Sequence, residues 1–96
     1  MECRRIENII FSKIAMKILI ALYLSKKPMT KYQLMKKVNV NYKILADRLN
    51  KLIEIGLIEV HYYKPLRYSL SKRIFINKEY EPILKYIEVM SNIIRL

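Results

Sequence analysis

The chain has 96 residues, which is enough for one domain with a modest hydrophobic core. Nineteen Lys and Arg residues against eight Asp and Glu residues give a formal net charge of +11. Such a charge attracts polyanions, with nucleic acid as the first candidate and an anionic membrane surface as the second. One cysteine excludes an internal disulfide, and one histidine excludes a metal site built from several histidines, so we expect no metal and no cofactor.

The most apolar segment, residues 9–24, raises the question of a membrane span. It is shorter than the roughly 20 residues that cross a bilayer, and it contains Lys13 and Lys17, which are costly in a membrane. We therefore expect a buried helix at about residues 6–24 of a cytoplasmic protein, with no membrane partner. The abundance of Ile and Lys and the single Gly resemble the composition of thermophile proteins.

Two short helices are predicted in the middle of the chain. Thr30 is a suitable N-cap for a helix over residues 31–38, and Asn41 is a suitable N-cap for a helix over residues 42–55. Gly56 stands where a helix can end in a left-handed residue. Because only a tight link separates the two helices, the pattern predicts a helix-turn-helix at about residues 30–55.

A β-hairpin and a last helix are predicted in the second half. Residues 57–63 are rich in strand formers, residues 64–67 contain a turn-forming proline, and residues 68–70 return as a strand. Residues 71–77 fit either a short helix or a longer return strand. The last helix is predicted over residues 77–96, with Pro82 near its first turn. The expected fold class is mainly α with a small β-hairpin, in a single domain over residues 1–96.

The segment from Leu45 to Val60 resembles the winged-helix regulators of the MarR-like, HxlR-like and PadR-like families of bacteria and archaea. In these families a recognition helix with apolar residues at this spacing is followed by a Gly-Leu-Ile that enters the first wing strand. Residues 68–71 are similar to their Tyr-x-Leu-Thr at the end of the wing. Here the wing is short, and the usual Gly after the second strand is absent. The resemblance covers about residues 14–71 and implies a winged helix-turn-helix with its wing at about residues 57–71.

The resemblance implies double-stranded DNA as a partner, with the recognition helix in the major groove and the basic wing on the minor groove or backbone. Leu45, Leu49 and Leu52 are expected to face inward, which leaves the opposite side of the helix free to read base edges. The expected DNA-binding residues are Lys31, Tyr32, Tyr42, Lys43, Ala46, Asp47, Asn50, Lys64 and Arg67. An ion-pair ladder of Asp47 with Lys43 and Lys51 is at least as compatible with the spacing as base reading.

Both long helices are apolar on more than one face, beyond what a small core requires. This pattern predicts a homodimer built from the helices at about residues 6–24 and 78–95. The expected interface residues are Ile10, Phe11, Ile14, Ile87, Met90, Ile93 and Ile94. The pattern leaves open which rows face the core and which face a partner subunit.

The expected function is therefore a sequence-specific transcriptional regulator. The sequence shows no Gly-rich phosphate loop, nucleophile–base pair or cluster of metal ligands, so we do not expect an enzyme. The alternative is a winged-helix protein-interaction module of a transcription or replication assembly, because a fold does not determine a function. The basic recognition face favours DNA. The operator sequence, the direction of regulation and any small-molecule effector stay open.

Overall fold

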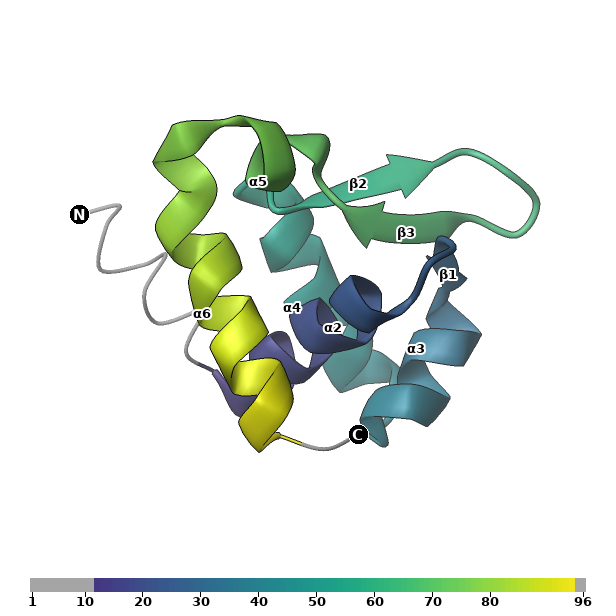
Figure 1. Ribbon diagram of the computed structural model, residues 1–96. Coiled ribbons are helices and arrows are strands. Elements are labelled where there is room, and N and C mark those ends of the chain that lie inside the picture. Colours follow the sequence, from purple (N-terminus) through teal and green to yellow (C-terminus); the bar gives the residue numbers. More distant parts are fainter. Residues whose placement is uncertain (1–11, 95–96) are drawn as a thin grey trace.

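The computed structural model describes residues 12–94, and Figure 1 shows its mainly helical architecture with one small sheet. This confirms the predicted fold class. The helices and strands are α2 (Lys13–Leu24), β1 (Met29–Thr30), α3 (Lys31–Val38), α4 (Tyr42–Glu54), β2 (Ile58–His61), β3 (Arg67–Leu70), α5 (Lys72–Ile76), the 3-10 helix η1 (Lys78–Tyr80) and α6 (Glu81–Ile93). Residues 6–11 of the predicted first helix lie outside the described residues.

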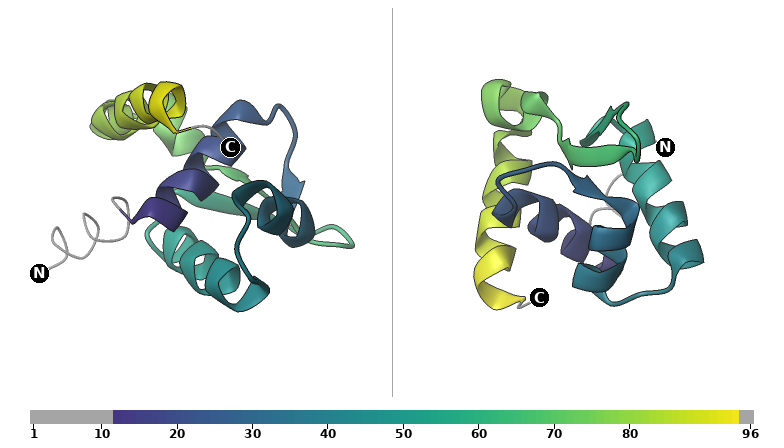
Figure 2. Two further views of the ribbon diagram at one scale, coloured as in Figure 1. Left: turned by 90° about the horizontal axis from the view of Figure 1, so that it is seen from below. Right: turned by 90° about the vertical axis from the view of Figure 1, so that its right-hand side faces the viewer.

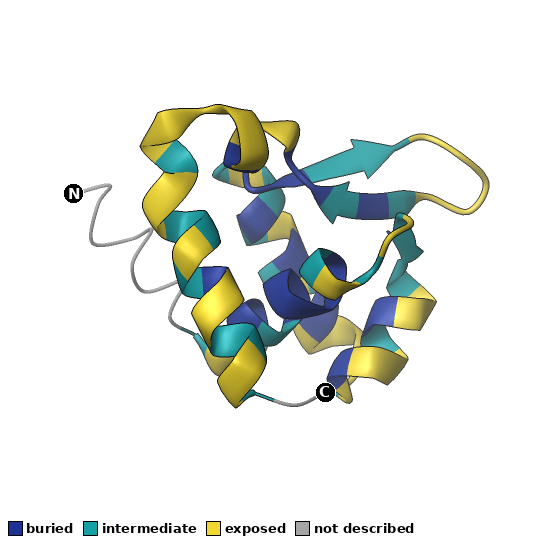
Figure 3. Cartoon of the chain, in the orientation of Figure 1, coloured by how far each residue is buried: buried dark blue, intermediate teal, exposed yellow. Residues whose placement is uncertain are grey.

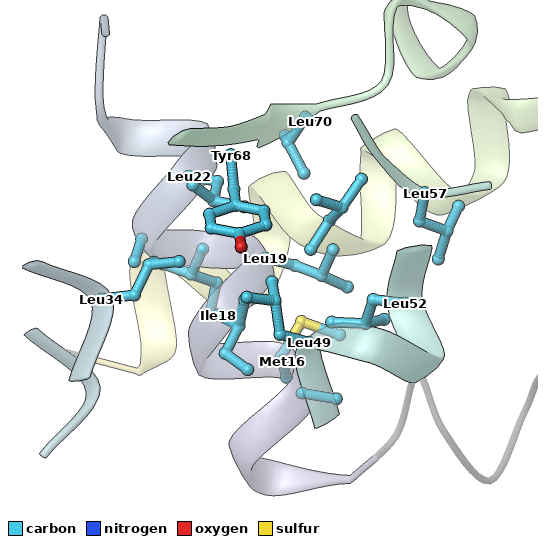
Figure 4. Close-up of a cluster of buried hydrophobic side chains, with 14 of the residues drawn as sticks. Met16, Ile18, Leu19, Leu22, Leu34, Leu49, Leu52, Leu57, Tyr68 and Leu70 are labelled. Carbon is cyan, nitrogen blue, oxygen red and sulfur yellow. The ribbon is translucent and has the colours of Figure 1, made fainter. Parts of the chain in front are cut away.

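Helix α2 is the centre of the hydrophobic core. It contacts α3, α4 and β3, and it also contacts α6 (Figure 2). Figure 4 shows its side chains Met16, Ile18, Leu19 and Leu22 among leucines of the other elements and the ring of Tyr68. Because α2 is surrounded within a single chain, its apolar character on several faces is already used in the core.

The helix-turn-helix has the predicted caps. The Thr30 hydroxyl accepts a hydrogen bond from the Gln33 N–H at 3.2 Å, and the Gln33 side chain accepts one from the Thr30 N–H at 3.0 Å. The Asn41 side chain accepts a hydrogen bond from the Ile44 N–H at 2.9 Å. Asn39 ends α3 in a left-handed conformation with φ 61°, which turns the chain sharply toward α4.

The inner side of α4 is fixed by three leucines, as the sequence predicts. Leu45, Leu49 and Leu52 each have an exposed fraction of 0%. Gly56 follows the helix with a positive φ of 83°, which confirms the predicted stop. Leu57 and Ile58 then enter the core as the chain becomes β2. The helix can therefore present only its opposite side to a partner.

The sheet has the strand order β1-β3-β2, and both pairings are antiparallel. The hairpin of β2 and β3 confirms the prediction, although β2 ends at His61, earlier than expected. The sequence analysis did not anticipate β1, in which Met29 pairs with Tyr68 and Thr30 with Arg67. This pairing attaches the start of α3 directly to the loop end of β3.

Residues 71–77, which fit either a short helix or a longer strand in the sequence, contain the short helix α5. Ser71 caps α5, since its hydroxyl accepts a hydrogen bond from the Arg73 N–H at 3.3 Å. The predicted last helix begins later than residue 77, as η1 followed by α6, and Pro82 lies in the first turn of α6. Ile87 anchors α6 in the core. Within residues 12–94, every helix is too short or too polar to cross a membrane.

Candidate nucleic-acid interface

The outer side of α4 is open to solvent where the sequence predicts base contacts. Tyr42, Lys43, Asp47 and Asn50 are exposed, and Ala46 is half-buried. Ile44 is also 37% exposed, an apolar group on this side that the sequence analysis did not include. The side therefore combines a cation, a carboxylate, an amide, a phenol and small apolar surface, and it contains donors and acceptors that suit base edges.

The carboxylate of Asp47 is engaged in ion pairs along α4. Its Oδ2 lies 3.3 Å from Nζ of Lys51 and also contacts the guanidinium of Arg48. The pair with Lys51 is the second half of the ladder that the spacing predicts. Arg48 was not among the predicted residues, because neighbours in a helix do not generally face each other. In the free chain, Asp47 thus neutralises cations on the exposed side of α4.

The start of α3 and the start of α4 are joined by a lysine and two tyrosines. Nζ of Lys31 lies 5.6 Å from the ring centroid of Tyr42 and 6.0 Å from that of Tyr68. On the next turn of α3, Nζ of Lys36 lies 4.9 Å above the ring of Tyr32. Such cation–π contacts stabilise exposed sites by about 0.5–1 kcal/mol. They hold the predicted cation Lys31 beside Tyr42 and Tyr68, and they place Lys36, which was not predicted, beside Tyr32.

A pocket between α3, α4 and the hairpin is lined by Lys31 and the three tyrosines, but not by Lys36. We name it the junction pocket, and its volume is about 370 Å³. It is lined by Thr30, Lys31, Tyr32, Tyr42, Pro65, Leu66 and Tyr68. The structure thus brings three predicted site residues together with Pro65 and Leu66, which sequence reasoning had treated only as part of a turn.

The predicted wing cations occupy different surroundings. Lys64 is exposed in the loop, whereas Arg67 is half-buried at the start of β3. Arg67 lines a second pocket of about 410 Å³ with Lys27, Pro28 and Tyr63. Figure 3 shows the loop of the hairpin as an exposed projection beyond the half-buried strands. Of the two predicted wing cations, Arg67 and not Lys64 lines this second pocket.

A polar contact joins the two strands of the hairpin near its loop. Nε2 of His61 lies 2.7 Å from the hydroxyl oxygen of Ser69 on the neighbouring strand. The His61 ring also stacks on Tyr63, with centroids 6.3 Å apart and an interplanar angle of 6°. These contacts fix the direction in which the loop leaves the sheet.

No group of three or more His, Cys, Asp and Glu side chains within residues 12–94 is placed to hold a metal ion. Burial and the neighbouring Glu88 carboxylate raise the pKa of Tyr23, but this residue belongs to the contact between α2 and α6.

The arrangement of these elements is shared with solved regulators of 14–21% identity. A possible HxlR family transcriptional factor from Thermoplasma volcanium aligns with a TM-score of 0.67 and 21% identity over 91% of this chain and 82% of that chain. The transcriptional repressor BigR from Xylella fastidiosa aligns with a TM-score of 0.76 and 14% identity over 99% and 89%. Diamide-treated YodB from B. subtilis aligns with a TM-score of 0.61 and 15% identity over 93% and 85%.

The chain has the winged helix-turn-helix fold. No family model matches its sequence, and no curated protein matches it. In this fold α3 and α4 are the helix-turn-helix and β2 and β3 form the wing, as the sequence predicts. The identities are low enough that the likeness establishes the fold alone.

The predicted dimer residues differ in how far they reach the surface. Ile10 and Phe11 lie outside the described residues. Ile14, Met90 and Ile94 are half-buried, and Ile93 has an exposed fraction of 66%. Ile87, in contrast, has an exposed fraction of 0% and packs in the core of the single chain, so it has no surface to offer a partner. The outer side of α6 also exposes Val89, which the prediction omitted.

Proposed function

We propose that this chain is a sequence-specific, double-stranded DNA-binding transcriptional regulator that acts in the cytoplasm. The observation that carries the proposal is the convergence of the starts of α3 and α4 with the wing around the junction pocket. Two helix N-termini with their free N–H groups, the Lys31 ammonium and the nearby exposed Lys43 favour a polyanion there. The net charge of +11 and the regulators with the same fold support this partner.

In the proposed complex, the first turns of α4 enter the major groove and the wing lies on the minor groove or backbone. The inward leucines leave one side of α4 to face DNA. On that side Lys43 suits guanine or phosphate, Asn50 suits adenine, and Ala46 suits a thymine methyl group. Lys64 on the exposed loop suits phosphate.

We also propose that the regulator is a homodimer, with α6 providing the described part of the interface. Val89 and Ile93 have exposed fractions of 56% and 66%, and Met90 and Ile94 are half-buried beside them. An apolar row on a helix whose other side is already in the core favours burial against a second chain. Two chains related by a two-fold axis would place two copies of α4 on successive major grooves.

The test is selection of bound duplexes from a random DNA pool, followed by affinity measurements on the selected site and a shuffled duplex at two salt concentrations. A regulator enriches one motif and binds it at least about 1,000-fold more tightly than shuffled DNA. Enrichment of an inverted repeat supports the homodimer. Equal affinity for all duplexes contradicts the sequence specificity, because it is non-specific binding to phosphates. No affinity at low salt contradicts DNA binding and leaves the protein-interaction module.

A further inference from the structure

The junction pocket is apolar and aromatic, although it opens between three elements that we propose to bind DNA. Three of its lining side chains are tyrosines, and Pro65 and Leu66 close it from the wing. The hydroxyl of Thr30 already accepts the capping hydrogen bond of α3. Lys31 is the charged side chain of this lining. A surface meant only for phosphate would instead gain from several cations.

The aromatic groups of the pocket are unevenly covered. Tyr68 is 2% exposed and forms the inner wall, whereas Tyr32 and Tyr42 are 59% and 55% exposed and border the opening. Leu66 on the wing side is 40% exposed. Large exposed apolar groups around a concave surface mark a place where a ligand excludes water. The pocket therefore offers exposed ring surface of Tyr32 and Tyr42, with Lys36 and Lys31 each lying over one of these rings.

Perfect duplex DNA offers this pocket no free base face for stacking. It presents phosphates and base edges, while the flat faces of its bases are stacked inside the helix. An unpaired base has a free flat face, which stacks on tyrosine rings irrespective of its sequence. The ammonium of Lys31, held 5.6 Å from the Tyr42 ring, lies where it can pair with the phosphate of the same nucleotide. The volume of about 370 Å³ falls within the roughly 300–1,000 Å³ of small-ligand pockets.

We propose that the junction pocket binds one unpaired nucleobase of DNA, so that this regulator prefers a duplex with an extrahelical base to the perfect duplex of the same sequence. The inference rests on the proposed DNA binding. It adds a second mode of recognition, by stacking in the pocket, to base reading along α4.

The experiment compares two fluorescently labelled duplexes of one sequence, one perfect and one with a single bulged thymidine, by anisotropy at the same salt concentration. We expect the bulged duplex to bind at least about fivefold more tightly, which corresponds to the lower limit of about 1 kcal/mol for one stacked base. A 2-aminopurine at the bulge is expected to change its fluorescence on binding, because stacking on tyrosine alters its environment. Equal affinity for the two duplexes overturns the proposal.

Variants of the pocket are compared by one ratio, the affinity for the bulged duplex divided by the affinity for the perfect duplex. Tyr42→Leu removes a ring but keeps an apolar side chain, and Leu66→Lys places a charge in the lining; both are expected to reduce the ratio to about 1. Tyr42→Phe keeps the ring and the ratio. Tyr62→Leu is the matched control, since Tyr62 is 85% exposed and lies outside the lining. A ratio that survives Tyr42→Leu and Leu66→Lys overturns the proposal.

The outcomes separate this inference from the proposed function. If perfect duplexes bind with sequence preference and the bulge adds no affinity, the proposed regulator function is supported and the proposed binding of an unpaired base is wrong. If perfect duplexes lose affinity when thymidine is replaced by deoxyuridine and the bulge adds nothing, the pocket takes the methyl group of a paired thymine, which also overturns the inference. If neither duplex binds, both proposals fail.

Discussion

Nζ of Lys51 lies 3.3 Å from Oδ2 of Asp47, one turn earlier on the exposed side of α4. The guanidinium of Arg48 contacts the same carboxylate oxygen. One acidic side chain therefore neutralises two cations on the helix that we propose to enter the major groove. Both cations and the carboxylate are partly exposed, so these pairs add little to the stability of the fold. Their main effect is to reduce the positive charge that α4 presents to DNA.

Replacing Asp47 by Asn is expected to strengthen binding to every DNA sequence. The change frees Lys51 and Arg48 for phosphates, and each added phosphate contact steepens the log–log dependence of affinity on salt by about 0.9. Anisotropy titrations at four salt concentrations, on a selected site and on shuffled DNA, measure both effects. Glu79→Gln is the control, because it removes one exposed carboxylate from η1 and leaves α4 intact.

A different result would show that Asp47 contacts a base. If Asp47→Asn weakens binding at one position and relaxes the requirement for cytosine there, the carboxylate accepts a hydrogen bond from that base. The ion pairs with Lys51 and Arg48 would then have to open in the complex.

Replacing Lys43 by Ala is expected to cost about 1–3 kcal/mol of binding free energy on the preferred site and less on shuffled DNA. The reason is that Lys43 is exposed in the first turn of α4, where a side chain can reach guanine. Competition titrations with the preferred site and with shuffled DNA measure the loss of binding free energy on each. Lys78→Ala, which removes an exposed cation from η1, provides the control. Equal losses on both DNAs would show that Lys43 contacts phosphate only.

Replacing Lys64 by Ala is expected to weaken binding to all sequences alike and to lower the salt slope by about 0.9, the effect of one lost phosphate contact. Arg67→Ala is made separately, because Arg67 is half-buried in β3 and pairs with β1. The DNA affinity of the Arg67→Ala variant is compared with that of the wild type only after urea unfolding has shown how much stability the variant loses. An effect of Lys64→Ala confined to one operator, with the slope unchanged, would contradict the backbone contact.

The helix-turn-helix was predictable because its signals are local. Thr30 and Asn41 cap the two helices within three residues of themselves, and Gly56 marks the end of α4 through its own backbone. The strand β1 was not predictable in this way. Its two residues, Met29 and Thr30, carry no periodic pattern, and they become a strand only through pairing with Tyr68 and Arg67.

The candidate interface was predictable as a set of exposed side chains but not as a site. Spacing along α4 indicates which residues face away from the core, and the structure agrees for Tyr42, Lys43, Asp47 and Asn50. Nothing in the local sequence places Leu66 in the same pocket as Tyr42, since that arrangement depends on the direction of the wing. The excess of apolar residues in α2 was interpreted as a dimer signal, whereas the core of one chain already surrounds this helix.

Substitutions on the exposed side of α6 and on its core side are expected to have different effects. The double change Val89→Ser and Ile93→Ser is expected to convert a dimer into a monomer, because it removes the exposed apolar groups proposed to meet a second chain. Light scattering at micromolar concentration measures the mass. The folded monomer should persist, since both positions are more than half exposed. The matched change is Ile87→Ala, which removes a fully buried side chain of the same helix.

Ile87→Ala is expected to lower the free energy of unfolding by about 2–5 kcal/mol through the cavity it leaves in the core, as urea unfolding would measure. Because Ile87 has no exposed surface, any loss of dimer in this variant should follow the loss of folded protein and not precede it. The double variant should show the opposite order, with dissociation at low urea and little change in the unfolding of the monomer. A wild-type chain that is monomeric at micromolar concentration, or a double variant that stays dimeric, would contradict an interface on α6.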